Sequence, residues 1–587
     1  MPVLALLAIL LFPPLLGLDL RTQDSLTLAL MFAIAAVGLD IFSGYGGQIS
    51  IGNVGFVAIG AYASAYFAGV HGWNPWLTLP ASIVVAGAVA IVLGIPMVRL
   101  GELGGAFVTF FFGFVVFVVV GMNALTPYTG AQAGVFVPAL TLGSLSFTSG
   151  SALYYLAWTI LAITALISVR YANCRSGKAL RVIKRSPVVA ASLGIRVQRT
   201  KLTAFVYSAM TAGAAGFVFG QVLAYISPEN FPTMMSLMLF VMVIVGGLGS
   251  IAGPILGTVV MTLVVQATRE AGDYRELAYA VILVLVLIFM PEGLYGELER
   301  WFSRMPWRQR KHASPSVQRT SVLAAGAGGE SAGASLELSG VTVAFGGVRA
   351  LNGAAFKVET GRIHALMGPN GAGKTTILNC ITGLQRYAGS IRLDDVELNG
   401  KTPQQIRALG ITRTFQNPSL VGDLTVLENV ELGMFGEDPS GLLGDLLPTR
   451  STLHRDRRAR SAAEDALTLV GLAPALWNKR ANGLSLAEQK LTDVARAIVA
   501  RPRLVLLDEP SAGLHEDEID RVRAAMQNIN SSSGVSVVVI AHHVGFLRDV
   551  AHSATVLDFG RAIAQGSPDE VVEQERVIEV FLGVSHA

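Results

Sequence analysis

The sequence predicts two parts of different fold class: a polytopic α-helical membrane half of about eight to ten helices, then an α/β half. The chain has 587 residues, and residues 1–295 contain nearly all of its long apolar runs. Only 14% of the residues are charged, against roughly 25% in ordinary soluble proteins. Residues 368–376 read Gly-Pro-Asn-Gly-Ala-Gly-Lys-Thr-Thr, a complete phosphate-binding loop. Together these features indicate that a nucleoside triphosphate is used at a membrane.

Composition excludes some classes of function. The formal net charge of +3 is too small to indicate nucleic-acid binding. Cys174 and Cys380 match no metal-ligand spacing, so we expect free thiols. Residues 1–20 are apolar but lack a basic start and a small-residue cleavage site. They are interpreted as a first transmembrane segment rather than a removed signal peptide.

The membrane half divides into apolar runs of spanning length, since a helix needs about 20 residues to cross a bilayer. The candidate spans are 2–18, 25–43, 51–70, 78–98, 104–122, 152–170, 203–224, 235–267 and 276–291. The run 235–267 is too long for one simple helix and is interrupted by the glycine-rich residues 246–254. We expect two helices around an irregular break, which membranes tolerate where protein or a water-filled cavity covers it.

Two clusters of basic residues, within 170–201 and 300–311, predict which loops are cytoplasmic. Both ends of the region 203–291 then lie in the cytoplasm, which requires an even number of membrane crossings. Splitting 235–267 into two helices gives an even number. Within the first of these loops, residues 186–195 read as a short helix ending at Gly194. Such a cytoplasmic helix could receive force from a motor domain, or it could be an ordinary solvated loop.

Polar residues in the spans are candidates for the path of a transported solute. Asp40 lies near the end of one span, and Gln48 and Asn53 follow it. The alternative is an interfacial helix end whose polar groups are satisfied locally.

The junction between the halves has the composition of a tether. Residues 299–334 are first basic and then rich in Gly, Ala and Ser, which is typical of flexible linkers. The expected organisation is a permease-like domain at 1–298, this linker, and a nucleotide-binding domain at 335–587.

In the second half, residues 336–338 and 341–345 are predicted strands, and a buried strand at 363–367 precedes the phosphate-binding loop. Backbone N–H groups of this loop and the following helix would cradle the phosphates, the lysine would reach the β and γ oxygens, and the next hydroxyl would bind Mg²⁺. The candidate nucleotide ligands are Gly368, Pro369, Asn370, Gly371, Ala372, Gly373, Lys374, Thr375 and Thr376. Of these, Thr375 is the candidate metal ligand.

Asp508 ends the hydrophobic strand 504–508, and Glu509 follows it. Asp508 would hold Mg²⁺, and Glu509 would polarise the attacking water. Gln416 follows a strand-like run and could contact Mg²⁺ and water, while His542 ends another strand and could donate to the γ-phosphate. A lone Gln or His usually has a structural role, so the roles given to Gln416 and His542 depend on the order of these residues after the phosphate-binding loop.

Residues 484–490, Leu-Ser-Leu-Ala-Glu-Gln-Lys, resemble the signature motif of ABC ATPases. The phosphate loop, Gln416, this signature, the acidic pair, residues 511–515 and His542 stand in the order of that family. The resemblance implies a helical subdomain and a head-to-tail dimer, in which Ser485 completes the ATP site of the opposite subunit. It also implies that Phe345 stacks on adenine.

Finer details resemble the ABC importers of branched-chain amino acids. The ATPase half is similar to LivG-type subunits at residues 345–347, 413–417, 436–460 and 577–583, and the membrane half is similar to LivM-type permeases at residues 38–50, 193–195, 226–230, 245–250 and 290–293. The resemblance implies a natural permease–ATPase fusion with a type II importer-like membrane domain.

By this resemblance we expect ATP-driven import of branched-chain amino acids across the inner membrane of a prokaryote, with the ATPase domain in the cytoplasm. Expected partners are an extracytoplasmic binding protein and either a LivH-like permease with a LivF-like ATPase or a second copy of the chain. Urea, amides or aromatic acids are alternative solutes. An exporter half-transporter and a regulatory ATPase without transport are alternative classes.

Three positions depart from the family pattern. Ala487 replaces the usual signature glycine, His515 stands where Asp or Asn is frequent, and Asn53 stands where this permease family commonly has His. Because alanine restricts the backbone more than glycine does, the first departure predicts a weaker ATP site where Ser485 contributes in a heteromeric assembly.

Overall fold

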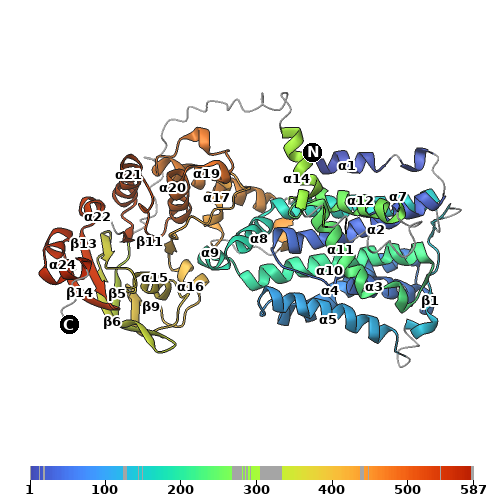
Figure 1. Ribbon diagram of the computed structural model, residues 1–587, viewed down its shortest axis with the longest axis horizontal. Coiled ribbons are helices and arrows are strands. Elements are labelled where there is room, and N and C mark those ends of the chain that lie inside the picture. Colours follow the sequence, from blue (N-terminus) through green and yellow to red (C-terminus); the bar gives the residue numbers. More distant parts are fainter. Residues whose placement is uncertain are drawn as a thin grey trace. The chain divides into compact units, whose positions relative to one another are not determined.

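The computed structural model describes residues 2–11, 13–16, 20–122, 129–142, 145–147, 150–267, 281, 284–285, 288–290, 292–303, 333–436, 442–446, 449–541 and 544–582. The chain forms two compact units, shown in Figure 1. The first unit comprises Met1–Lys184 and Gln198–Ala313, and the second comprises Arg185–Val197 and Ser314–Ala587.

The first unit is a bundle of helices, most of them apolar. Its helices are α1 (Pro2–Ile9), α2 (Leu20–Asp40), α3 (Asn53–Ala65), α4 (Thr78–Met97), α5 (Glu102–Val120), α7 (Gly150–Asn173), α8 (Arg175–Arg185), α10 (Val197–Leu223), α11 (Thr233–Gly246), α12 (Ala252–Ala267) and α14 (Gly293–Ser303). Within the described residues, seven helical segments are long and apolar enough to cross a membrane, and α12 is a shorter apolar helix. The predicted polytopic membrane half is confirmed. Most of the predicted span 276–291 lies outside the described residues.

The predicted span 2–18 is wrong as a single helix. Helix α1 ends at Ile9, and a separate 3₁₀ turn covers Pro13–Leu16. The two prolines in this turn lack an N–H donor and disfavour helical backbone before them. Eight helical residues extend only about 12 Å, well short of the roughly 30 Å hydrocarbon core.

The predicted break inside 235–267 is confirmed. Helix α11 ends at Gly246 and α12 begins at Ala252. Gly247 and Gly249 have φ values of 115° and 84°, which glycine adopts without the clash that a Cβ would cause. The Asp40 carboxylate covers this irregular segment, since its Oδ1 accepts a 2.8 Å hydrogen bond from the Gly249 N–H.

The three polar candidates of the membrane half are therefore placed in the protein interior. Asp40 is fully buried at the break, Gln48 donates from Nε2 to the Gly46 carbonyl, and Asn53 accepts from Ser208 Oγ at 3.4 Å. Asp40 Oδ2 and Asn53 Nδ2 have no hydrogen-bond partner within the described part of the chain. Asp40 thus has a structural role, and contact with a solute stays a prediction for all three.

The second unit is built on two sheets. The six-stranded sheet has the order β10 (Ile411–Arg413), β11 (Leu504–Asp508), β12 (Ser536–Ile540), β7 (Ile363–Met367), β13 (Ser553–Asp558), β14 (Arg561–Gly566), and all but the last pairing are parallel. Strands β7, β11 and β12 are buried along their whole length, as expected for continuous apolar runs covered on both faces.

The smaller sheet is antiparallel. It has the order β6 (Val348–Val358), β5 (Leu336–Phe345), β8 (Ala388–Leu393), β9 (Val396–Glu397). The two strands predicted within 336–345 are one strand, β5, whose register shifts between Leu338 and Val341. An irregularity of pairing, not a chain break, causes the interruption in the sequence pattern.

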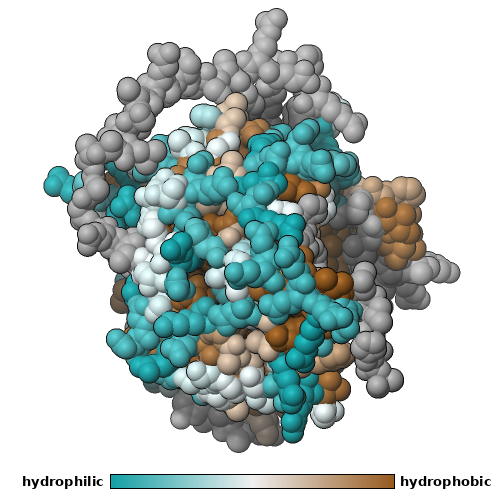
Figure 2. All heavy atoms as spheres, turned by 90° about the vertical axis from the view of Figure 1, so that its left-hand side faces the viewer, coloured by the Kyte–Doolittle hydropathy of each residue, from teal (hydrophilic) through white to brown (hydrophobic). Residues whose placement is uncertain are grey.

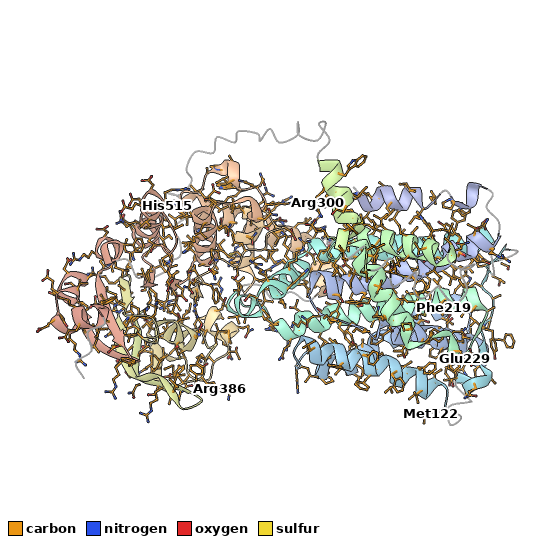
Figure 3. The ribbon with its side chains drawn as sticks, in the orientation of Figure 1. Met122, Phe219, Glu229, Arg300, Arg386 and His515 are labelled. Carbon is orange, nitrogen blue, oxygen red and sulfur yellow. The ribbon has the colours of Figure 1, made fainter. Side chains whose placement is uncertain are left out.

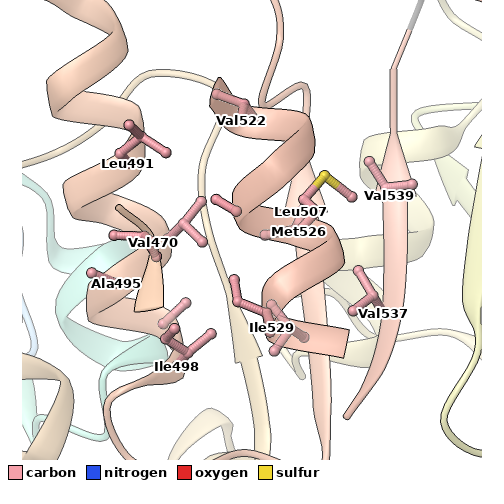
Figure 4. Packing of buried hydrophobic residues seen from close by; sticks show 14 of the residues in the cluster. Val470, Leu491, Ala495, Ile498, Leu507, Val522, Met526, Ile529, Val537 and Val539 are labelled. Atoms are coloured by element: carbon pink, nitrogen blue, oxygen red, sulfur yellow. The ribbon is translucent and has the colours of Figure 1, made fainter. Parts of the chain in front are cut away.

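The helices of the second unit are α9 (Pro187–Ser192), α15 (Lys374–Ile381), α16 (Pro403–Ala408), α17 (Val426–Glu431), α18 (Leu442–Leu446), α19 (Arg450–Leu469), α20 (Leu486–Ile498), α21 (Glu516–Ser533), α22 (Val544–Val550), α23 (Pro568–Val572) and α24 (Glu575–Leu582). Helices α17, α19 and α20 pack on one another as the predicted helical subdomain. One core joins this group to the sheet, and in Figure 4 Met526 and Ile529 of α21 lie between Ile498 of α20 and Val537 of β12. The face of this unit seen in Figure 2 is mainly hydrophilic.

His364 lies in β7, just before the phosphate-binding loop, and is fully buried. Its two ring nitrogens bond Ser553 Oγ at 2.8 Å and Thr555 Oγ1 at 3.0 Å, and the ring stacks on Phe356. Burial lowers the pKa of His364 from 6.5 to about 4, so the folded protein keeps this imidazole neutral near pH 7.

This histidine makes folding of the second unit sensitive to acid. The neutral His364 side chain contributes its full stabilisation of the fold above pH 6.5, the pKa in the unfolded chain. This stabilisation is lost as the pH falls from 6.5 towards 4, because the unfolded chain then binds a proton that the folded protein does not. The limit of the effect is about 3 kcal/mol. We expect the urea midpoint of the unit, measured by pulse proteolysis of the purified full-length protein, to fall more between pH 7.5 and 5 in the wild type than in His364→Gln. Equal decreases in both proteins would contradict this assignment.

Candidate nucleotide-binding site

The phosphate-binding loop has the predicted strand–loop–helix context. Strand β7 ends at Met367, and α15 begins at Lys374. Gly368, Gly371 and Gly373 have φ values of 142°, 83° and 98°. A Cβ at Gly368 would lie 2.3 Å from the Leu557 carbonyl oxygen. Gly368 therefore needs to be glycine, both for its φ and for its close approach to Leu557.

Lys374 lies at the start of α15 with its side chain buried. Its ammonium donates to the carbonyls of Gly368 and Pro369 at 2.8 and 2.9 Å, so the side chain folds back along the loop. Burial lowers the pKa of Lys374, and the negative charges of Glu509 and Asp508 oppose this shift. The ammonium therefore lies in the field of both acidic candidates.

Asp508 ends β11, between β10 and β12. Its Oδ2 accepts a 2.8 Å hydrogen bond from Arg413 Nη2, and both side chains are nearly inaccessible to solvent. Its backbone N–H donates to Thr414 Oγ1 at 3.3 Å. The carboxylate is thus oriented by the segment that leads to Gln416.

Glu509 is held at three points. Its N–H donates to the Ile540 carbonyl at 2.9 Å, and its carbonyl accepts a 2.7 Å hydrogen bond from Lys490 Nζ. Its carboxylate Oε2 accepts from Gln416 Nε2 at 2.8 Å. Its φ of 50° is rare for a residue with a side chain, and such backbone persists where the surroundings impose it. The structure thus brings together two of the three predicted catalytic residues.

The oxygen atoms near the loop suit a small hard cation. Thr375 is exposed in the first turn of α15 and offers a hydroxyl. Asp508 offers Oδ1, which the guanidinium of Arg413 does not use, and Gln416 offers its amide oxygen while its nitrogen bonds Glu509. Hydroxyl, carboxylate and amide oxygens are ligands that Mg²⁺ accepts, so these residues fit the predicted metal.

Other sequence-predicted residues lie apart from this cluster. His542 lies outside the described residues. Phe345 ends β5 and is 51% exposed, which leaves its ring accessible to a planar base. His515 caps the N-terminus of α21 at the surface, where Figure 3 labels it.

The signature residues form the start of α20. Ser485 is the exposed N-cap, and its hydroxyl accepts from the Glu488 N–H while the Glu488 carboxylate accepts from the Ser485 N–H. Ala487 lies in the first helical turn with its side chain fully buried, and its φ is not among the positive values. The backbone at Ala487 is therefore unstrained, because helical geometry suits any L-residue. The weaker ATP site stays a prediction.

Sequence reasoning missed three residues of the site. Arg413 bonds the Asp508 carboxylate, Asn379 bonds Arg413, and Lys490 bonds the Glu509 carbonyl, each from another segment of the chain. For Arg413 and Lys490, the available signal was that a buried Lys or Arg usually requires a partner.

Comparison with known proteins agrees with both halves of the chain. Residues 21–290 match the family described as the permease component of the branched-chain amino acid transport system, and residues 351–512 match the ABC transporter family. The chain is 35% identical to the high-affinity branched-chain amino acid transport ATP-binding protein BraF of Pseudomonas aeruginosa, over 42% of this chain and 97% of BraF. It is 30% identical to the permease LivM of Escherichia coli, over 46% of this chain and 69% of LivM. A crystal structure of a nucleotide-free ATP-binding cassette from an ABC transporter is 25% identical, with a TM-score of 0.37, covering 42% of this chain and 98% of the cassette.

The two-part fold, the phosphate-binding loop with its acidic pair, and the matches to the ABC transporter family and to BraF define an ABC transporter protein that binds nucleotide and hydrolyses ATP in support of transport. The chain belongs to the branched-chain amino acid transport family of ABC proteins. It is a multi-pass membrane protein that joins a permease and an ATPase in one polypeptide.

Proposed function

We propose that this chain drives ATP-dependent import of branched-chain or similar hydrophobic amino acids across the cytoplasmic membrane of a prokaryote. The observation that carries the proposal is that both halves independently match subunits of the same kind of importer. Chance fusion of unrelated parts would not give this agreement. Urea, amides and aromatic acids are the alternative solutes.

For the nucleotide site we propose the following division of roles. The loop 368–376 holds the phosphates, with Lys374 at the β and γ oxygens, and Phe345 contacts adenine. Thr375, Gln416 and Asp508 hold Mg²⁺, which supplies neutralisation of phosphate charge when bound. Glu509, with Gln416 bonded to its carboxylate, orients and deprotonates the attacking water. His542 donates to the γ-phosphate, and Ser485 reaches the ATP of the opposite subunit.

The chain contains one permease and one ATPase half, so further subunits are required for a pair of each. The relatives BraF and LivM are separate proteins. We propose a complex with an extracytoplasmic binding protein, a LivH-like permease and a LivF-like ATPase, or else a homodimer. Residues 299–334 would be the cytoplasmic tether between domains 1–298 and 335–587.

Uptake of radiolabelled leucine tests the proposed function. The chain is expressed in cells without their own branched-chain importers, either alone or together with the binding protein, permease and ATPase encoded beside it. Energy-dependent accumulation that excess isoleucine competes away is expected. ATP hydrolysis without flux of any amino acid, urea or amide would contradict import and favour a regulatory ATPase. Efflux from preloaded cells would favour an exporter.

The loop 186–195 is proposed to transmit nucleotide-driven motion to the permease. In the second unit, Leu193 and Ile195 are buried, and the Ile195 carbonyl accepts a 3.1 Å hydrogen bond from Gln404 Nε2. Gly194 has a φ of 83°, and a Cβ there would lie 2.9 Å from Gly436 Cα. The segment therefore lies on α16 with little room for change.

We expect replacement of Leu193 and Ile195 by Ser to uncouple the transporter, because two buried apolar side chains of about 2 kcal/mol each are lost from this contact. Leucine uptake should fall at least tenfold, and stimulation of ATPase activity by the loaded binding protein should disappear, while basal hydrolysis persists. Val188→Ser, at a site that is 48% exposed, is the matched control. Normal uptake with retained stimulation would contradict this role.

A further inference from the structure

Arg413 and Asp508 form a buried ion pair beside the phosphate-binding loop. Their side chains are 2% and 4% exposed, and Nη2 lies 2.8 Å from Oδ2. Nη1 of the same guanidinium donates to Asn379 Oδ1 at 2.6 Å. Since Asn379 lies on α15, one arginine connects the helix that follows the loop to the strand that ends in Asp508.

Burying this ion pair costs free energy of folding. Burial lowers the pKa of Arg413, and the hydrogen bond and charge of Asp508 oppose the shift. Arg413 Nε has no hydrogen-bond partner among the described residues, although it is buried. Replacing such a pair by apolar side chains is often neutral or stabilising. Stability alone therefore gives no reason to keep an arginine at this position.

The arrangement has a consequence for the carboxylate. Arg413 occupies Oδ2, and the Asp508 backbone is fixed through Thr414 Oγ1, so Oδ1 is the atom left for another ligand. The cation of the loop itself, Lys374, donates to the carbonyls of Gly368 and Pro369. Without the guanidinium of Arg413, the Asp508 carboxylate would be free to turn, and Oδ1 would lose its fixed direction.

We propose that Arg413 is a positioning residue of the nucleotide site: it keeps Asp508 in the one orientation in which Oδ1 serves a divalent cation. This inference rests on the proposed metal role of Asp508. Groups that orient a metal ligand typically change metal affinity by about 10- to 100-fold when they are removed. Asn379 supports Arg413 and contributes less, because it touches no carboxylate.

The test uses Mn²⁺ as the probe for the cation, measured by electron paramagnetic resonance on the purified full-length protein with a non-hydrolysable ATP analogue. Arg413→Met is expected to raise the dissociation constant for Mn²⁺ by about tenfold or more. Binding of the analogue in EDTA should change less than about twofold, since the phosphate loop is intact. Arg413→Lys should lie between Arg413→Met and the wild type.

The matched control is Arg503→Met, which removes another ion pair of the same unit, Arg503 with Asp394, at a half-exposed position. It should leave Mn²⁺ affinity unchanged. If Arg413→Met does not fold, Asn379→Ala decides, with an expected increase of about threefold in the Mn²⁺ dissociation constant. Unchanged Mn²⁺ affinity in the folded Arg413 variants, or in Asn379→Ala where they do not fold, would overturn the inference, even with a lower melting temperature.

Asp508→Asn separates this inference from the function on which it rests. If Asp508→Asn weakens Mn²⁺ binding and the Arg413 variants do not, the role of Arg413 alone is wrong. If Asp508→Asn leaves Mn²⁺ binding intact, the proposed metal role of Asp508 is wrong as well.

Discussion

Replacing Glu509 by Gln is expected to slow ATP hydrolysis by about 10²- to 10⁴-fold and to leave ATP binding almost unchanged. The substitution keeps the size and shape of the side chain but removes the group that accepts a proton from water. Contacts of the phosphates with the loop 368–376 do not involve this carboxylate. The amide can still pair with Gln416, whose Nε2 lies 2.8 Å from Glu509 Oε2, so the local fold should persist.

The measurement is a single-turnover assay on the purified complex, together with binding of a fluorescent ATP analogue. Retained ATP should keep the two ATPase halves associated, which gel filtration in detergent reports. Glu516→Gln, at an exposed position in the first turn of α21, is the control and should hydrolyse at the parent rate. Parent-rate hydrolysis by Glu509→Gln would show that another group is the base.

The sequence predicted those parts of the site whose residues lie within one short segment of the chain. The phosphate loop follows one buried strand and precedes one helix, so its residues specify their own geometry. The acidic pair was predicted for the same reason, because it ends the apolar run 504–508. In the membrane half, the break between α11 and α12 was predicted from the glycine-rich residues 246–254. Two of these glycines, Gly247 and Gly249, have positive φ.

What could not be predicted depends on contacts between distant segments. The Arg413–Asp508 pair and the Lys490–Glu509 bond arise only because β10 pairs with β11 and α20 lies near the end of that strand. The helical backbone at Ala487 follows from the helix that Ser485 caps, which the residue type alone does not indicate. Prolines ended the first predicted span early, which hydropathy alone does not register.

The structure also connects the signature helix to the proposed catalytic region of the same chain. Lys490 bonds the Glu509 carbonyl, and Asp493 on the same helix accepts from the N–H of Phe415, the residue before Gln416. Helix α20 therefore bonds Glu509 directly and the backbone that leads to Gln416. Because Ser485 at its N-terminus is proposed to serve the opposite ATP, these bonds give a physical route by which one site could sense the other.

Replacing Lys374 by Ala is expected to remove nucleotide binding at this site and to abolish uptake. The ammonium is the positive side chain positioned at the loop, and it lies in the field of two carboxylates. Without it, the phosphates would face Asp508 and Glu509 with one fewer compensating charge. A hydrogen bond to a charged group contributes about 1.5–3 kcal/mol, so ATP affinity should fall by about 10- to 100-fold before the added repulsion is counted.

Titration with a fluorescent ATP analogue and leucine uptake in complemented cells measure the two effects together. Lys357→Ala, an exposed lysine of β6 in the same unit, should behave as the wild type. The result also distinguishes Lys374 from Glu509: loss of Lys374 removes binding, whereas loss of the Glu509 carboxylate preserves binding and removes turnover. Wild-type uptake with Lys374→Ala would refute ATP-driven transport by this chain, because the remaining loop N–H groups alone would then have to hold a bound triphosphate near the carboxylates of Asp508 and Glu509.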